Sequence, residues 1–250
     1  MMLPPLMKLL PVLMLLYIFP KQQAEIKFLF TGAMLKKVKI LLLLCFISAL
    51  PSAYYKAYSL YLKARKIENK NILKSINLYK KSIKIYNKFP EPYFRLGKFY
   101  MQKRKTLAQN YFNLTLKYLD NFRLKSEKYK FLITAGEFFE KQKNYKKAIK
   151  LYQNSLSLKT NENILFKTGR LCYFLKEYKK SQKFLEKYLS LTPKNDETQI
   201  EALKILYNIY MDSEEYQKAM QTLKKIYLLS PSSAILKKIT YLSNLINKIK

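Results

Sequence analysis

The residues that most often carry out enzyme chemistry are scarce in this chain of 250 residues. It contains no histidine, the commonest general base and metal ligand, and its two cysteines, Cys45 and Cys172, cannot build a structural zinc site. The four glycines form no phosphate-binding loop. Paired carboxylates such as Glu214-Glu215 fall where a turn or a helix start is expected, and there they favour a helix N-terminus. We therefore expect no catalytic site, no metal site and no cofactor.

Marker residues, small in all but one case, recur in pairs that are eleven or twelve residues apart from about residue 54 onward. Gly136 precedes Ala148 by twelve residues, and Gly169 precedes Ser181 by the same number. An aromatic or aliphatic residue follows each second mark at four positions, as Tyr152 follows Ala148, and this offset lies on one helix face. Each repeated unit is therefore predicted to consist of a helix, a turn, a second helix and a second turn. The marks in the second helices are Ser75, Ala108, Ala148, Ser181 and Ala219, and those in the first helices are Ala64, Gly97, Gly136, Gly169 and Tyr207.

These units resemble the tetratricopeptide repeat, a helix-turn-helix motif of 34 residues. Leu96-Gly97-Lys98-Phe99-Tyr100 matches its first helix, and Asn144-Tyr145-Lys146-Lys147-Ala148 matches the start of its second helix. The family's tryptophan is absent, and intervals of 33, 40, 33 and 38 between second-helix marks imply longer turns near Ser126 and Asp196. The resemblance implies an all-α solenoid of antiparallel helix pairs, with about five degenerate repeats over residues 54–231.

Residues 232–250 are predicted to form a C-terminal capping helix. Ile235, Ile239, Leu242 and Ile246 recur at helical spacing, with lysines and asparagine largely between them. A stack of repeats needs such a closing element because a single repeat cannot bury its apolar face.

Residues 34–53 show the order of a secretory signal. The basic stretch Met34-Leu35-Lys36-Lys37-Val38-Lys39 precedes an apolar run from Ile40 to Leu50, and the small residues Ser52 and Ala53 follow. The run fits a signal core and falls short of the roughly 20 residues that a straight transmembrane helix needs. Because neither possible cleavage site is clean, a signal peptide and an uncleaved membrane anchor stay alternatives. Both predict an exported protein that is periplasmic, otherwise extracytoplasmic or membrane-anchored.

Residues 1–33 form a second hydrophobic stretch, which has two interpretations. Either Met34 is the true initiator and the stretch is a start-site artefact, or the chain carries an additional membrane segment before a basic loop. We favour initiation at Met34, and both interpretations put the repeats outside the cytoplasmic membrane. Removal of the signal would leave Cys172 without a disulfide partner in the chain, and its place on the inward face of a repeat predicts a buried thiol.

The chain is strongly basic, with a formal net charge of +32. Such a surface attracts polyanions. Only five of the 48 basic residues are arginine, however, and lysine spread over the outer faces of helices is typical of a solvated surface. Nucleic-acid recognition usually depends on arginine for bidentate contacts, which disfavours a nucleic-acid partner. For an exported chain, an anionic membrane or an envelope polymer is the preferred electrostatic partner.

The resemblance also implies where a partner would bind, because repeats of this family expose the first helix of each hairpin on a concave groove. The predicted groove residues are Phe94, Lys98, Met101, Ile133, Glu137, Glu140, Phe166, Arg170, Tyr173, Lys204, Asn208 and Met211. Glu137 and Glu140 interrupt any clamp for a terminal carboxylate. We expect a non-enzymatic scaffold or adaptor that binds a protein or peptide at the cell envelope. The alternative is a lysine-rich module that binds anionic lipid, envelope polymer or nucleic acid, and whose complexes weaken steeply with salt.

Overall fold

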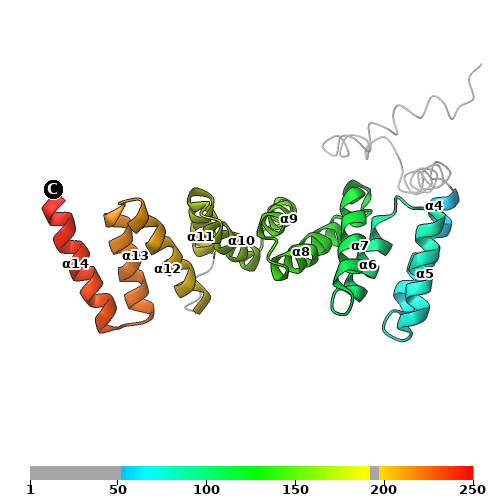
Figure 1. The fold of residues 1–250 in the computed structure, drawn as a ribbon, viewed down its shortest axis with the longest axis horizontal. Coiled ribbons are helices and arrows are strands. Elements are labelled where there is room, and N and C mark those ends of the chain that lie inside the picture. The colour runs from blue at the N-terminus through cyan, green and yellow to red at the C-terminus, as the bar shows by residue number, and fades with distance from the viewer. Residues whose placement is uncertain (1–51, 192–196, 250) are drawn as a thin grey trace, which may run out of the picture. The chain divides into compact units, whose positions relative to one another are not determined.

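The structure, a computed structural model, describes residues 52–191 and 197–249 of the chain. These residues form eleven α-helices and one short 3-10 helix, and they contain no strand (Figure 1). This confirms the predicted all-α fold. Apart from Ser52 and Ala53, with which the first described helix begins, the predicted leader and signal or anchor lie outside the described residues. Among the described helices, none combines the length and the hydropathy that a membrane span needs.

The chain divides between Asn87 and Lys88 into two compact units. The described part of the first unit is one hairpin, α4 (Ser52–Ile67) and α5 (Ile72–Ile85). The Ser82 hydroxyl donates to the carbonyl oxygen of Ala57 at 2.7 Å, and the Tyr79 hydroxyl donates to a Glu68 carboxylate oxygen at 2.9 Å. These bonds join the two helices around fully buried small residues, as the spacing predicts.

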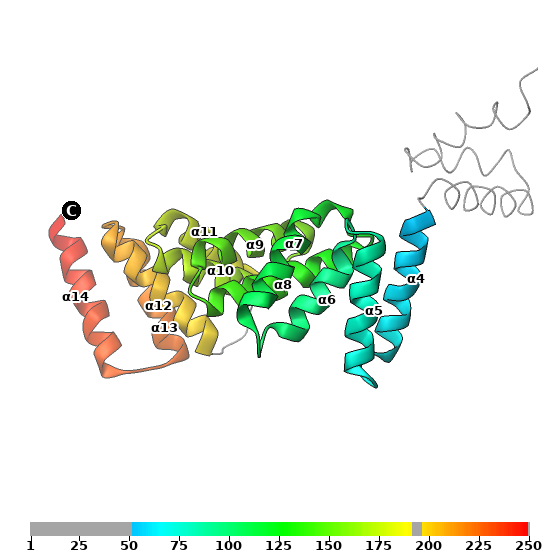
Figure 2. The same cartoon turned by 45° about the vertical axis from the view of Figure 1, so that its right-hand side comes forward.

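The second unit contains four further hairpins and a closing helix. Figure 2 shows α7, α9 and α11 following one another along one side of the stack, with α6, α8 and α10 beside them. The closing helix packs against α13 through the buried Leu242, within the residues for which a capping helix is predicted. The helices are α6 (Pro90–Tyr100), α7 (Lys105–Lys117), α8 (Lys125–Lys141), α9 (Tyr145–Leu158), α10 (Glu162–Phe174), α11 (Tyr178–Leu191), α12 (Glu197–Asp212), α13 (Tyr216–Leu229) and α14 (Ser233–Ile249).

Close contacts at the first-helix glycines explain the spacing of the small residues. A Cβ atom at Gly136 would lie 2.4 Å from Cε1 of Tyr152, the residue four positions after Ala148. A Cβ atom at Gly97 would lie 2.4 Å from Phe112, and one at Gly169 would lie 2.7 Å from Leu185, the equivalent residues of their own hairpins. Each glycine therefore lets its first helix approach the side chain four positions after the small mark of the second helix. In the last hairpin Tyr207 takes this place, and its ring lies instead under the Lys238 ammonium of α14, 5.8 Å from the ring centroid.

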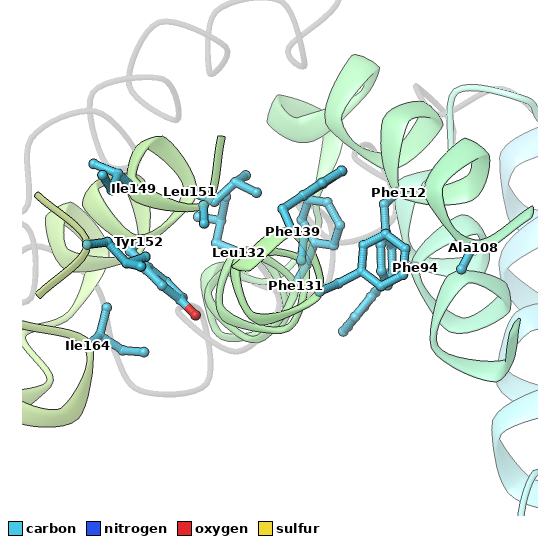
Figure 3. Packing of buried hydrophobic residues seen from close by; sticks show 14 of the residues in the cluster. Phe94, Ala108, Phe112, Phe131, Leu132, Phe139, Ile149, Leu151, Tyr152 and Ile164 are labelled. Carbon is cyan, nitrogen blue, oxygen red and sulfur yellow. The ribbon is translucent and has the colours of Figure 1, made fainter. Parts of the chain in front are cut away.

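Aromatic rings fill the core between the hairpins α6/α7 and α8/α9 (Figure 3). The fully buried Phe131 ring lies 5.4 Å from the Phe94 ring and 6.0 Å from the Phe112 ring, centroid to centroid. Phe122 stacks on it at 5.7 Å. Phe122 comes from the turn between α7 and α8, which includes the 3-10 helix η2 (Leu119–Asn121). The longer turn predicted near Ser126 is thus confirmed, whereas Asp196 lies outside the described residues.

Three of the turns inside the hairpins contain a residue with positive φ. Lys143, Lys176 and Glu214 have φ near 60°, and each lies five residues before a second-helix mark. The following N–H bonds back across the turn, as Asn144 N–H does to the carbonyl oxygen of Phe139 at 2.9 Å. This left-handed helix end normally favours glycine. The turn geometry is therefore set by packing of the two helices rather than by the turn residues themselves.

Replacing Lys143 with glycine should therefore stabilise the protein. A residue with a side chain pays about 1 kcal/mol or more for the left-handed conformation, and glycine does not, so we expect a gain of up to about 1 kcal/mol in the free energy of unfolding. Denaturant unfolding measures it. Lys150→Gly, in the exposed middle of α9, is the control and should cost about 1 kcal/mol. Equal losses in both variants would show that the turn does not store this strain.

Candidate functional site

Two of the twelve predicted groove residues lie in the core. The side chain of Phe94 is 2% exposed and packs against Phe131, and that of Phe166 is 5% exposed and packs against Tyr188. The prediction that these two residues line the groove is wrong, because each side chain packs against a neighbouring helix. The other ten predicted residues are exposed or partly exposed on α6, α8, α10 and α12.

Ion pairs join α8 to α10 on this exposed side. The Lys167 ammonium lies 2.7 Å from Glu137 Oε1, and Arg170 Nη2 lies 3.0 Å from Glu140 Oε1. The second oxygen of Glu140 accepts a hydrogen bond of 2.7 Å from the Tyr152 hydroxyl. Burial and this carboxylate raise the pKa of Tyr152 well above its usual range. Glu140 is therefore held from two helices, and its charge is fixed at one place on the surface.

Further contacts join α10 to α12. Arg170 Nη1 approaches Glu201 Oε1 at 3.9 Å, so one guanidinium bridges Glu140 and Glu201. The Asn208 amide donates to the Tyr173 hydroxyl at 3.4 Å. We call the exposed and partly exposed residues along the first helices α6, α8, α10 and α12 the first-helix face. They are Lys98, Met101, Ile133, Glu137, Glu140, Lys167, Arg170, Tyr173, Glu201, Lys204, Asn208 and Met211.

A buried ion pair joins α6 to α8 at the other end of the second unit. Arg95 Nη2 lies 3.0 Å from Glu127 Oε2, and the two side chains are 12% and 7% exposed. Glu91 is also buried and accepts a hydrogen bond of 2.9 Å from the Arg123 backbone N–H. Burial, and to a lesser degree the Glu127 charge, raise the pKa of Glu91. The guanidinium of Arg95 therefore compensates negative charge inside this hairpin contact.

Sequence reasoning missed Lys167 and Glu201 as members of the face. The signal was present, because Lys167 follows Glu137 by 30 residues and Arg170 follows Glu140 by the same number. An offset slightly shorter than one repeat brings opposite charges together on successive first helices. Glycine-centred spacing alone could not find them.

The structure offers no activated nucleophile at Cys172. Its thiol is buried and free, as predicted, and burial raises its pKa to about 11. The side chain therefore stays a neutral thiol at neutral pH. Within the described residues, no cluster of three or more histidine, cysteine or carboxylate side chains could hold a metal ion.

Comparison with known proteins agrees with this architecture. Residues 163–195 match the tetratricopeptide repeat family. YrrB, described as "a TPR protein with an unusual peptide-binding site", is 16% identical with a TM-score of 0.53, over 73% of this chain and 90% of that one. MamA from Desulfovibrio magneticus RS-1 is 16% identical with a TM-score of 0.46, over 63% and 85%. A further MamA structure is 20% identical with a TM-score of 0.48, over 68% and 96%. No curated protein matches the chain.

Stacked antiparallel hairpins, each closed by small-residue contacts between its two helices and with a row of first helices open to solvent, define an α-solenoid. Residues 163–195 match a tetratricopeptide repeat, and the fold of the described residues is that of a tetratricopeptide-like solenoid. Structures at 16% identity establish the fold and leave the ligand of this chain to its own residues.

Proposed function

We propose that this chain is a non-enzymatic tetratricopeptide repeat scaffold that binds an extended segment of a partner protein along its first-helix face. The observation that carries the proposal is the network that links α8, α10 and α12 through Glu140, Arg170 and Glu201. It holds positively and negatively charged groups in place across successive repeats. Fixed groups lose less conformational entropy when a ligand binds, which favours affinity.

The same face offers apolar contacts between its charges. Ile133, Tyr173 and Met211 are partly buried, so each presents some apolar surface while its other side packs on the stack. The Asn208 amide can donate to and accept from a peptide backbone. Aromatic and methionine contacts would supply affinity, and the mixed charges would set the register of the bound segment.

Selection of short random peptides against the full-length chain tests this proposal. Tyr173→Ala and Asn208→Ala should each weaken binding of the selected peptides by about tenfold or more, as expected for central interface residues. Leu228→Ala, which truncates an 80% exposed side chain on α13, is the control and should leave binding unchanged. The proposal fails if no peptide is selected, or if the selected peptides bind all three variants as they bind the unaltered chain.

The proposed location is the cell envelope, where the scaffold is either exported or membrane-tethered. This rests on the basic, apolar and small-residue order of residues 34–53. Membrane fractionation and the intact mass of the natively expressed protein test it. A mass starting near Tyr54 would indicate a cleaved signal, and a retained N-terminus in the membrane fraction would indicate an anchor. A full-length chain in the cytoplasmic fraction would rule out both.

A further inference from the structure

The two helices of each hairpin in the second unit differ in charge. The first helices α6, α8, α10 and α12 carry carboxylates as well as lysines and arginines. On α7, α9, α11, α13 and α14, in contrast, the one carboxylate is Glu186, and there is no arginine. The positive charge of this unit is therefore concentrated on the second helices and the closing helix.

Seven lysines lie on α9 and α11. Five of them are exposed and make no ion pair, and we call them the lysine face: Lys146, Lys150, Lys179, Lys183 and Lys187. Four of the five occupy equivalent positions, two before and two after the small mark of each helix. They therefore project from the same side of successive hairpins, along the row that α7, α9 and α11 form in Figure 2.

This arrangement works against the stability of the helices that carry it. Lys179, Lys183 and Lys187 follow one another at four-residue intervals, where like charges repel. Glu186, whose Oε1 accepts hydrogen bonds from the Tyr210 hydroxyl at 2.7 Å and the Gln182 amide at 2.9 Å, does not relieve this repulsion fully, because its single negative charge faces three ammonium groups. A negatively charged surface laid on the lysine face would remove the repulsion.

We propose that the lysine face docks on the anionic headgroups of a lipid bilayer. Lysine is a compact point charge, which suits a fluid surface of phosphates better than the bidentate contacts of arginine that nucleic-acid recognition favours. Exposed leucines lie at the C-terminal ends of neighbouring second helices: Leu158 is 37%, Leu191 42% and Leu228 80% exposed. Aliphatic side chains beside lysines can enter a membrane interface.

The burial of the aromatic side chains on the second helices argues against a single-stranded nucleic acid as the ligand. Such ligands stack their bases on exposed aromatic rings. On α7, α9, α11 and α13 the aromatic side chains are all buried or partly buried, as Tyr145 is against Phe174. The lysine face and the first-helix face belong to different helices of each hairpin. Lipid contact therefore does not depend on the proposed peptide binding.

Lysine-specific acylation of the full-length chain, followed by mass spectrometry, tests the proposal site by site. Vesicles of phosphatidylcholine with phosphatidylglycerol should slow acylation of the lysine face several-fold, and vesicles of phosphatidylcholine alone should not. The exposed first-helix lysines Lys98, Lys125, Lys141 and Lys204 should react equally in both. Uniform protection of all lysines, or protection of neither set, would overturn the proposal. Protection of the lysine face by a DNA or RNA oligonucleotide but not by anionic vesicles would assign the face to nucleic acid instead.

Partitioning of charge variants gives a second, independent measurement. One variant replaces the lysine face with glutamine, and the matched variant replaces Lys98, Lys103, Lys125, Lys141 and Lys204, so the net charge changes equally. The quantity compared is the ratio of the partition coefficients onto anionic and neutral vesicles. The contribution of the basic N-terminal segment to this ratio is the same in both variants and in the unaltered chain. A lysine near an anionic surface contributes about fivefold, so the lysine-face variant should lose at least about 100-fold in this ratio. Equal losses in the two variants would show attraction by net charge alone and contradict a docking face.

Discussion

Replacing Phe131 with alanine is expected to lower the free energy of unfolding by about 3–5 kcal/mol, the cost of removing a fully buried aromatic side chain. Phe131 is 0% exposed and contacts the rings of Phe94, Phe112 and Phe122, which come from α6, α7 and the turn before α8. Its removal leaves a cavity bounded by three segments that cannot all move inward. Because each repeat is stabilised mainly by its neighbours, the substitution should weaken the contact between the hairpins α6/α7 and α8/α9.

Denaturant unfolding followed by circular dichroism measures this loss. Phe174→Ala is the matched control, because Phe174 is 69% exposed and its ring packs against that of Tyr145. We expect the control to cost less than about 1 kcal/mol. If the two variants were destabilised equally, the aromatic cluster would not be the main contact between these hairpins.

Replacing Arg95 with methionine should cost a similar amount, about 3–5 kcal/mol at neutral pH, by a different mechanism. Methionine keeps much of the volume of the side chain but removes the charge that faces Glu127. The buried carboxylate of Glu127 would then lie near Glu91, whose pKa burial already raises. Glu127 would keep the mostly exposed Lys130 ammonium, 3.6 Å from its Oε1, but removing one partner of a buried ion pair still costs more than the pair contributes.

The control for this variant is Arg104→Met, at an exposed position in the turn between α6 and α7. It should change the free energy of unfolding by less than about 0.5 kcal/mol. The loss in Arg95→Met should shrink at acidic pH, because protonation of Glu91, whose pKa burial raises, removes negative charge beside Glu127. A loss that is independent of pH would indicate that packing, rather than charge, accounts for the role of Arg95.

The fold could be predicted because tetratricopeptide repeats depend on local rules that repeat along the chain. Gly136 and Ala148 mark a close helix contact, and that contact imposes the same residue types at the same spacing in each copy. The longer turn before α8 was predicted from the interval of 40 residues between Ala108 and Ala148, but the packing of its residues was not predicted. Phe122 fills a gap beside Phe131, and only the three-dimensional packing shows that gap.

The candidate site was predicted less completely, because a helical projection does not distinguish the solvent side from the side that faces the next hairpin. Phe94 and Phe166 were placed in the groove although they lie beneath the guanidinium groups of Arg95 and Arg170. The charge separation between first and second helices was hidden in a single value for net charge. It became visible once each lysine was assigned to its helix.

Site-specific photocrosslinking in the native cell tests the central claim, that the first-helix face binds a partner protein. A photoreactive residue at position 208 on α12 is compared with one at position 221 on α13, both of which replace exposed polar side chains. We expect the photoreactive residue at position 208 to form a discrete protein adduct. The yield of this adduct should fall at least about tenfold when Tyr173 is also replaced with alanine. Adducts from position 221 alone, or equal adducts from both positions that do not respond to Tyr173→Ala, would contradict binding of a partner on the first-helix face.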